Sequence, residues 1–152
     1  MIRKGSHADA PFMRSMLAHA YGWRVNQLDA EIPLTRYVEN WGRAGDIAVI
    51  AAETGNRVGA AWLRIFSEDS PGYGFIDERT PELTISVVPS RRRHGLGQEL
   101  LDALLARARE ASHNGVSLSV EVDSPAVAFY ERNGFEAVRE SDGGLVMRRD
   151  LP

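Results

Sequence analysis

The chain has 152 residues, a formal net charge of −3, no cysteine, and apolar and charged fractions typical of a soluble globular protein. A chain of this length usually folds around one core, so we expect a single domain over residues 1–152. The lack of cysteine excludes a thiol nucleophile and a disulfide, and the histidines lack metal-ligand spacing, so no metal is expected. The slightly acidic balance and the short apolar runs predict a cytoplasmic protein without nucleic-acid or membrane partners.

Helical and strand patterns alternate in the first half of the chain. Apolar residues recur at helical spacing from Met13 to Ala20, Asp9 is a suitable N-cap, and the segment Tyr21-Gly22-Trp23 marks the end of that helix. In chain order, the elements predicted here are a strand at 1–4, a helix from Asp9 to Trp23, a weaker helix at 33–41, and a β-hairpin of strands 46–53 and 58–66.

The second half contains the clearest strand pattern, because apolar and polar residues alternate over 82–88 before Pro89 ends the strand. The predicted elements are a loop at 67–80, that strand, a helix from Leu96 to Asn114-Gly115, a strand at 116–122, a helix from Ser124-Pro125 to Asn133-Gly134, and a hairpin of 135–139 and 145–149. This order predicts an α/β fold with a mixed, mostly antiparallel sheet flanked by helices, including one parallel pair across the strand-helix-strand unit.

A basic, glycine-containing turn joins the strand that ends at Val88 to the helix that begins at Leu96. The first N–H groups of a helix lack intrahelical partners, and its N-terminus carries partial positive charge. Gly95 and Gly97 allow the backbone to approach a ligand closely, and the arginines at 91–93 add positive charge. The turn therefore predicts an anion site suited to a pyrophosphate, with a solvated basic loop as the alternative.

Two familiar phosphate motifs do not fit this turn. A P-loop requires a lysine after its second glycine, and Gln98 follows Gly97 here. A dinucleotide fingerprint requires a third glycine, where this chain has Leu100.

Two segments resemble the signatures of the GNAT acetyltransferases. Residues 92–97, Arg-Arg-His-Gly-Leu-Gly, are similar to the family pattern R/Q-x-x-G-x-G/A, and residues 123–135 are similar to N-x-x-A-x-x-[LF]-Y-x-x-x-G-F, with Asp123 in place of Asn. The resemblance implies a splayed sheet whose gap receives the pantetheine arm of acetyl-CoA. The cofactor contacts that it implies are Val87, Arg92, Arg93, His94, Gly95, Leu96, Gly97, Gln98 and Asp123.

The aspartate in the second signature departs from the family pattern. An ionised Asp123 cannot donate the hydrogen bond that asparagine gives, so this cofactor contact has an alternative, in which Asp123 supports the N-terminus of the following helix.

The chemistry implied by the resemblance is direct attack of an amine on acetyl-CoA. Tyr130 takes the position of the general acid, and its alternative is a core tyrosine beside Phe129. Glu82 is expected to be the general base, acting through water, with Glu121 as a second candidate and a solvated strand-end charge as the alternative. A backbone N–H near Val87 or Val88 is the expected oxyanion donor.

Aromatic residues before and on the predicted strands are candidates for the acceptor site. We expect Trp62, Tyr73 and Phe75 to line it, although Trp62 has a core position as its alternative, and Asp77 and Glu78 would make its mouth acidic. The predicted acceptor is a small-molecule or peptide amine, and homodimer formation is left open. Two other functional classes remain, namely a non-catalytic acyl-CoA-binding domain and an unrelated nucleotide-phosphate binder.

Overall fold

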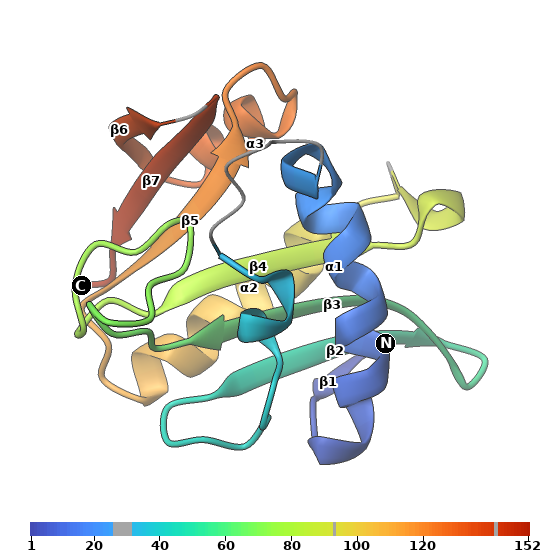
Figure 1. The fold of residues 1–152 in the computed structure, drawn as a ribbon. Coiled ribbons are helices and arrows are strands. Elements are labelled where there is room, and N and C mark those ends of the chain that lie inside the picture. The colour runs from blue at the N-terminus through green and yellow to red at the C-terminus, as the bar shows by residue number, and fades with distance from the viewer. Residues whose placement is uncertain (26–31, 93, 142) are drawn as a thin grey trace.

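The computed structural model describes residues 1–25, 32–92, 94–141 and 143–152 (Figure 1). Its elements in chain order are β1 (Ile2–Lys4), a 3-10 turn (His7–Asp9), α1 (Ala10–Val25), a second 3-10 turn (Leu34–Tyr37), β2 (Ile47–Glu53), β3 (Asn56–Arg64), β4 (Glu82–Val87), a third 3-10 turn (Pro89–Arg91), α2 (Leu96–Glu110), β5 (Gly115–Glu121), α3 (Ala126–Arg132), β6 (Glu136–Ser141) and β7 (Gly144–Asp150).

The described strands form one sheet in the order β1-β2-β3-β4-β5-β7-β6. Neighbouring strands are antiparallel except for β4 and β5, which are parallel and are connected through α2. The predicted mixed, mostly antiparallel α/β architecture is therefore confirmed, and so is the parallel pair.

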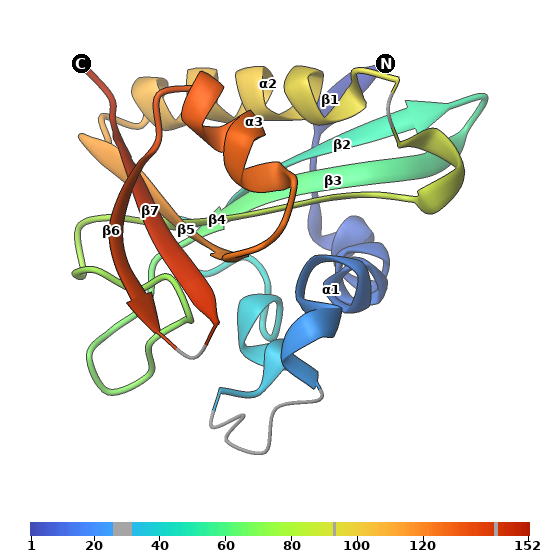
Figure 2. The ribbon, with the colours of Figure 1, turned by 90° about the horizontal axis from the view of Figure 1, so that it is seen from above.

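Helices cover both faces of the sheet, with α2 and α3 on one face and α1 on the other (Figure 2). The apolar stripe of α2, from Leu100 to Ala108, is fully buried in one core together with Leu118 and Met147. The second core lies under α1, where Met13 is fully buried together with Trp62. The amphipathic patterns read from the sequence thus place each helix against the sheet through its apolar face.

The N-terminal helix differs from the prediction at both ends. It begins at Ala10, because Ser6 caps the preceding 3-10 turn and Asp9 lies inside that turn, where its carboxylate accepts the Ser6 N–H at 2.8 Å. It also continues past the predicted stop to Val25, with a kink at Tyr21, whose φ of −126° and ψ of 20° are not helical. The Tyr21-Gly22-Trp23 segment is therefore a bend within α1.

Two other predicted helical segments are shorter than expected. Only the 3-10 turn Leu34–Tyr37 forms within 33–41, since Val38 leaves helical geometry with φ of −135°. The helix α2 ends at Glu110, and Gly115 already belongs to β5, whose neighbour β7 brings the Arg148 side chain against it.

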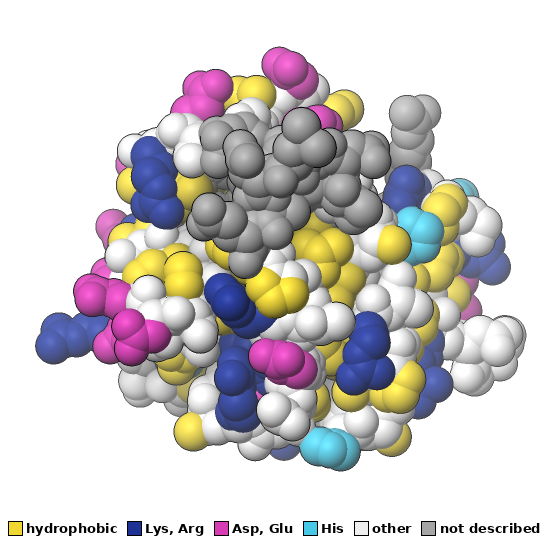
Figure 3. All heavy atoms as spheres, viewed as in Figure 1, with side chains coloured by type: hydrophobic (Ala, Val, Ile, Leu, Met, Phe, Trp, Pro, Cys, Tyr) yellow, Lys and Arg dark blue, Asp and Glu magenta, His cyan; other side chains and the backbone are white. Residues whose placement is uncertain are grey.

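The surface carries mixed charge, in keeping with the small net charge of the chain. On the described part of the face shown in Figure 3, basic and acidic side chains are interspersed. None of the described helices is long and apolar enough to cross a membrane.

Candidate active site

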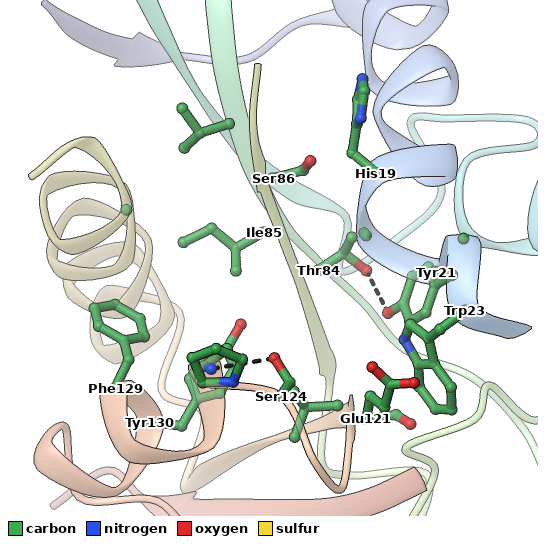
Figure 4. Close-up of a pocket in the computed structure, with 18 of the residues that line it drawn as sticks. His19, Tyr21, Trp23, Thr84, Ile85, Ser86, Glu121, Ser124, Phe129 and Tyr130 are labelled. Atoms are coloured by element: carbon green, nitrogen blue, oxygen red, sulfur yellow. Dashed lines mark hydrogen bonds between the residues drawn. The ribbon is translucent and has the colours of Figure 1, made fainter. Parts of the chain in front are cut away.

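The sheet splits between its two parallel strands. The register joins β4 to β5 only at Glu82 and Ser117, near the beginning of each strand. Beyond this point the structure contains a cavity of about 630 Å³. Its walls are residues 19–23 of α1, 83–87 of β4, 119–121 of β5, 124–126 before and at the start of α3, Phe129 and Tyr130 of α3, and Arg91, Arg92 and Gly97 at the basic turn (Figure 4).

The backbone of β4 presents hydrogen-bonding groups to this cavity. The Val88 N–H donates to the Val58 carbonyl at 2.9 Å, and the hydrogen bonds of an antiparallel pair alternate along the strand. The backbone groups of Ile85 and Val87 consequently point away from β3 and towards the gap. Val88 is not available as the expected oxyanion donor, whereas Val87 lies on the edge where the sequence prediction placed it.

The facing strand presents a matching edge. The Leu151 N–H donates to the Asn114 carbonyl at 2.8 Å, beside the paired strands β5 and β7. By the same alternation, the backbone groups of Ser119 and Glu121 point towards β4. An extended ligand that carries amides can bind between two such edges in the manner of an added strand.

The basic turn supplies the other end of the cavity. Gly95 caps α2 with a φ of +81°, which glycine adopts without the strain of other residues. A Cβ added at Gly97 would have no heavy atom within 4 Å, so this position opens onto free space. Arg92 donates from Nε to the Val87 carbonyl at 3.2 Å, and Arg91 pairs with Glu53. The helix N-terminus, the two glycines and the arginines together fit a diphosphate.

The remaining residues of the predicted cradle have different surroundings. Leu96 is buried in the core, and His94 is exposed. The Gln98 side chain bonds to Asp102 and Asn133, at 2.9 and 2.8 Å, so only its backbone remains for a ligand. Arg93 lies outside the described residues. Asp123 is exposed and is not on the cavity wall, whereas the hydroxyl of the next residue, Ser124, accepts the Ala126 N–H at 3.1 Å.

Tyr130 is on the cavity wall, as a general acid would have to be. It is only 8% exposed, and its ring packs edge-on against Phe129 and Phe135, with centroids 5.3 and 5.6 Å apart. Burial raises the pKa of its phenol well above the ordinary value. The hydroxyl therefore keeps its proton at neutral pH and can donate it.

The two carboxylates proposed for the general base occupy different environments. Glu82 is 1% exposed and is not on the cavity wall. Its carboxylate accepts hydrogen bonds from the Tyr37 hydroxyl and from the Gly74 N–H, the latter at 3.0 Å. Glu121 is exposed and lies on the cavity wall (Figure 4). Of the two side chains, only that of Glu121 is on the cavity wall.

The aromatic residues expected at the acceptor site are not on the cavity wall. Trp62 is fully buried, and its indole N–H donates to the Tyr37 carbonyl at 3.1 Å, which is the core position given as its alternative. Tyr73 and Phe75 are half-buried against the second core and are not on the wall. The Tyr73 ring nevertheless lies 6.2 Å from the ring of Tyr21, which does line the cavity.

One wall of the cavity is formed by α1, where the sequence did not identify His19 or Tyr21 as site residues. His19, Tyr21 and Trp23 line the cavity across β4 from α3, and the Tyr21 hydroxyl lies 3.1 Å from the Thr84 hydroxyl (Figure 4). Burial raises the pKa of Tyr21, so this phenol is neutral. The only signal in the sequence was a glycine flanked by two aromatic residues inside a helical pattern, which marks the kink.

The acidic residues expected at the mouth lie in the loop before β4. Asp77 and Glu78 are exposed and are not on the cavity wall. The Arg79 N–H donates to Asp77 at 2.8 Å, and this hydrogen bond lowers the pKa of that carboxyl. Glu121 is thus the acidic side chain on the described wall.

Comparison with known proteins gives one consistent family. Residues 11–135 match the sequence profile of the acetyltransferase (GNAT) family. A mycothiol acetyltransferase from Corynebacterium aurimucosum is 30% identical over 143 residues, which is 88% of this chain but 45% of that protein. The chain therefore spans less than half the length of this relative.

Solved structures have the same fold. The ribosomal-protein-alanine N-acetyltransferase from Brucella melitensis superposes with a TM-score of 0.73 and 26% identity, over 99% of both chains. The PaiA N-acetyltransferase from Thermoplasma acidophilum, in complex with coenzyme A, gives a TM-score of 0.68 at 18% identity, over 99% of this chain and 98% of that one. At that identity the second likeness concerns the fold alone.

Proposed function

Because the chain belongs to the GNAT acetyltransferase family, we propose that it transfers an acetyl group from acetyl-CoA to a primary amine by direct attack in a ternary complex. The observation that carries this proposal is the split between β4 and β5, which continues into the Gly95–Gly97 turn. The split can accept an extended arm that carries amides, and the turn can accept a diphosphate. Coenzyme A contains both groups, in that order along one molecule.

The residues of the cavity fit this cosubstrate. The backbone edge of β4 at Ile85 and Val87 would bind the amides of the arm, and the N–H groups that open α2 would bind the diphosphate. Arg92 lies between the edge of β4 and the N-terminus of α2, because it lines the cavity and forms a hydrogen bond to Val87. When bound, acetyl-CoA supplies a thioester, whose carbonyl carbon is open to a nucleophile.

Two side chains on the wall can move the protons. A cationic amine first loses a proton, and its neutral nitrogen then forms a bond to the carbonyl carbon. The carbon–sulfur bond breaks, the nitrogen loses its second proton, and the sulfur gains one. Tyr130 would donate the proton to sulfur, since its phenol is neutral and faces the cavity. Glu121 would accept the proton of the amine, directly or through water, from its exposed place on the same wall.

The acceptor is an amine of a small molecule or a peptide. Two similar proteins carry names that mention different molecules, mycothiol in one and the alanine of a ribosomal protein in the other. The wall formed by α1 and Glu121 combines aromatic surface with one carboxylate, an environment that attracts a cationic amine.

The test is turnover of acetyl-CoA with a panel of small primary amines and of peptides with a free N-terminal alanine or a lysine. Thiol release reports the reaction, and calorimetry with CoA and with ATP reports binding. We expect CoA to bind, ATP not to compete, and at least one amine to be acetylated. Binding of CoA without turnover on any amine would indicate an acyl-CoA-binding domain instead. Equal competition by ATP would indicate a nucleotide-phosphate binder.

A further inference from the structure

A buried cluster of hydrogen bonds lies directly behind the acceptor side of the cavity. At its centre, one oxygen of the Glu82 carboxylate accepts a hydrogen bond from the Tyr37 hydroxyl. The other oxygen accepts a hydrogen bond from the Gly74 N–H at 3.0 Å. The Tyr37 hydroxyl in turn accepts the Tyr73 N–H at 2.7 Å. We call these four residues the Glu82 cluster. One carboxylate thereby joins β4, the 3-10 turn at Leu34–Tyr37 and the loop before β4.

The loop fits around this carboxylate at very close range. A Cβ added at Gly72 would overlap the Glu82 carboxylate and would lie 2.8 Å from the Tyr37 hydroxyl. A Cβ added at Gly74 would lie 2.6 Å from the backbone carbon of Leu118. Such contacts are tighter than packed side chains tolerate, so the loop needs glycine at both positions. The loop backbone is thus held between Glu82 on one strand and β5 on the other.

The cluster is connected to the cavity wall by direct contacts. The ring of Tyr37 lies against the ring of Tyr21, with centroids 4.7 Å apart, and Tyr21 lines the cavity. The Gly74 backbone lies against β5, where its added Cβ would come within 2.9 Å of the Ser119 nitrogen, and Ser119 also lines the cavity. Displacement of the loop would therefore reach both sides of the acceptor wall.

We propose that Glu82 is a positioning residue, whose carboxylate fixes the loop at 72–74 and the Tyr37 turn and thereby sets the acceptor wall formed by Tyr21 and Ser119. Both carboxylate oxygens already accept hydrogen bonds from this chain, and the side chain is 1% exposed. The side chain is not on the cavity wall. This assignment rests on the proposed acetyl transfer and replaces the role of general base that the sequence suggested for Glu82.

The test compares Glu82→Gln and Tyr37→Phe with Glu140→Gln, which removes an exposed carboxylate on β6. Both variants of the cluster leave a buried hydrogen-bonding group without its partner, a loss that corresponds to about ten-fold in an equilibrium. We expect the amides of Tyr73 and Gly74 to exchange hydrogen about ten-fold faster than in the wild type. We also expect the acceptor KM to rise about ten-fold, with kcat at saturating amine and the CoA Kd within about two-fold.

Tyr37→Phe distinguishes a positioning role of Glu82 from a role as general base. It does so even where Glu82→Gln does not fold, because it keeps the Glu82 carboxylate in place. An unchanged acceptor KM and unchanged exchange in Tyr37→Phe would overturn the proposal. So would a fall in kcat of about a hundred-fold in Glu82→Gln with an unchanged acceptor KM, since that is the pattern of a lost proton acceptor. If the wild type acetylated no amine, the proposed function would fail, while the exchange of the loop amides would still report on Glu82.

Discussion

The Nε of Arg92 donates a hydrogen bond to the carbonyl oxygen of Val87, with 3.2 Å between the two atoms. This contact connects the basic turn to the edge of β4 that faces the gap. A cationic side chain is therefore held at the point where the proposed arm-binding edge of β4 ends and the proposed phosphate-binding N-terminus of α2 begins.

Replacement of Arg92 by alanine tests this arrangement. We expect Arg92→Ala to raise the Kd for CoA about ten-fold, the cost of one charge-assisted hydrogen bond to phosphate, with kcat nearly unchanged. Calorimetry with CoA measures the change. The control is Arg109→Ala, which removes an exposed arginine from the last turn of α2. Equal weakening by both replacements would mean that general charge, and not the position of Arg92, determines the affinity.

The two glycines of the turn should respond in opposite ways to alanine. Gly97 lies in the first turn of α2 with open space around its Cβ position, so Gly97→Ala should gain up to about 1 kcal/mol of stability and raise Tm. Gly95 has a φ of +81°, so Gly95→Ala should cost about 1 kcal/mol. Both should weaken CoA binding, because the backbone no longer approaches the diphosphate as closely.

Thermal unfolding and CoA calorimetry on the same two proteins check this pair. A gain in Tm accompanied by a loss of affinity at Gly97 would identify a position kept for binding at the expense of stability. Unchanged CoA affinity in Gly97→Ala would argue against the turn as the diphosphate site.

The sequence predicted the fold well, because the elements of the fold depend on local patterns. The alternation over 82–88 and the apolar stripe from Leu100 to Ala108 identify β4 and α2 without reference to other parts of the chain. The glycines and arginines of the turn lie close together in the sequence, so a common role can be proposed for them from the sequence alone.

The wall of the cavity at α1 could not be read in this way, because distant segments build it. Tyr21 lies at the kink in α1, and its partner Thr84 is 63 residues away in the sequence. Glu82 was expected to be the general base because of its position at the start of β4. The strand position was correct, but burial under the Tyr37 turn removes the carboxylate from the cavity. Long-range packing decided its surroundings.

Removal of the Tyr130 hydroxyl should slow chemistry without affecting binding. We expect Tyr130→Phe to lower kcat about a hundred-fold, which is typical for the loss of one general acid, and to leave the CoA Kd within about two-fold. Burial raises the pKa of Tyr130, so the wild type should lose no activity through ionisation of this phenol up to about pH 10. A kcat equal to the wild type at saturating amine would exclude Tyr130 from proton transfer.

Replacement of Glu121 by glutamine should slow the removal of the proton from the amine. We expect kcat to fall about a hundred-fold at neutral pH and to recover as the pH approaches the pKa of the amine, near 10 for an alkyl amine, because the neutral acceptor is then supplied by solvent. A pH series with one amine measures this. Glu140→Gln, on the exposed strand β6, is the matched control. The absence of recovery at high pH would indicate that Glu121 contributes binding and not proton transfer.

Asp9 stabilises the N-terminal region through charge, and the effect should depend on pH. Its carboxylate is 1% exposed and accepts hydrogen bonds from Arg3 at 2.9 Å and from Arg57 at 2.7 Å. The hydrogen bond from Arg3 is the largest of the interactions that hold its pKa well below the ordinary value of 3.8. A carboxyl with a lowered pKa in the folded state adds stability above its unfolded pKa, and this stability is lost as the pH falls through the folded pKa.

Asp9→Asn should therefore lower the free energy of unfolding by roughly 2 kcal/mol at neutral pH, since it removes hydrogen bonds between charged groups. The difference from the wild type should stay constant down to about pH 4 and shrink below it, as the wild-type carboxylate becomes protonated. Urea unfolding across this range measures both curves, and Asp69→Asn, at an exposed loop position, should follow the wild type. A difference that is as large at the lowest pH as at neutral pH would mean that Asp9 acts through the shape of its hydrogen bonds to Ser6 and not through its charge.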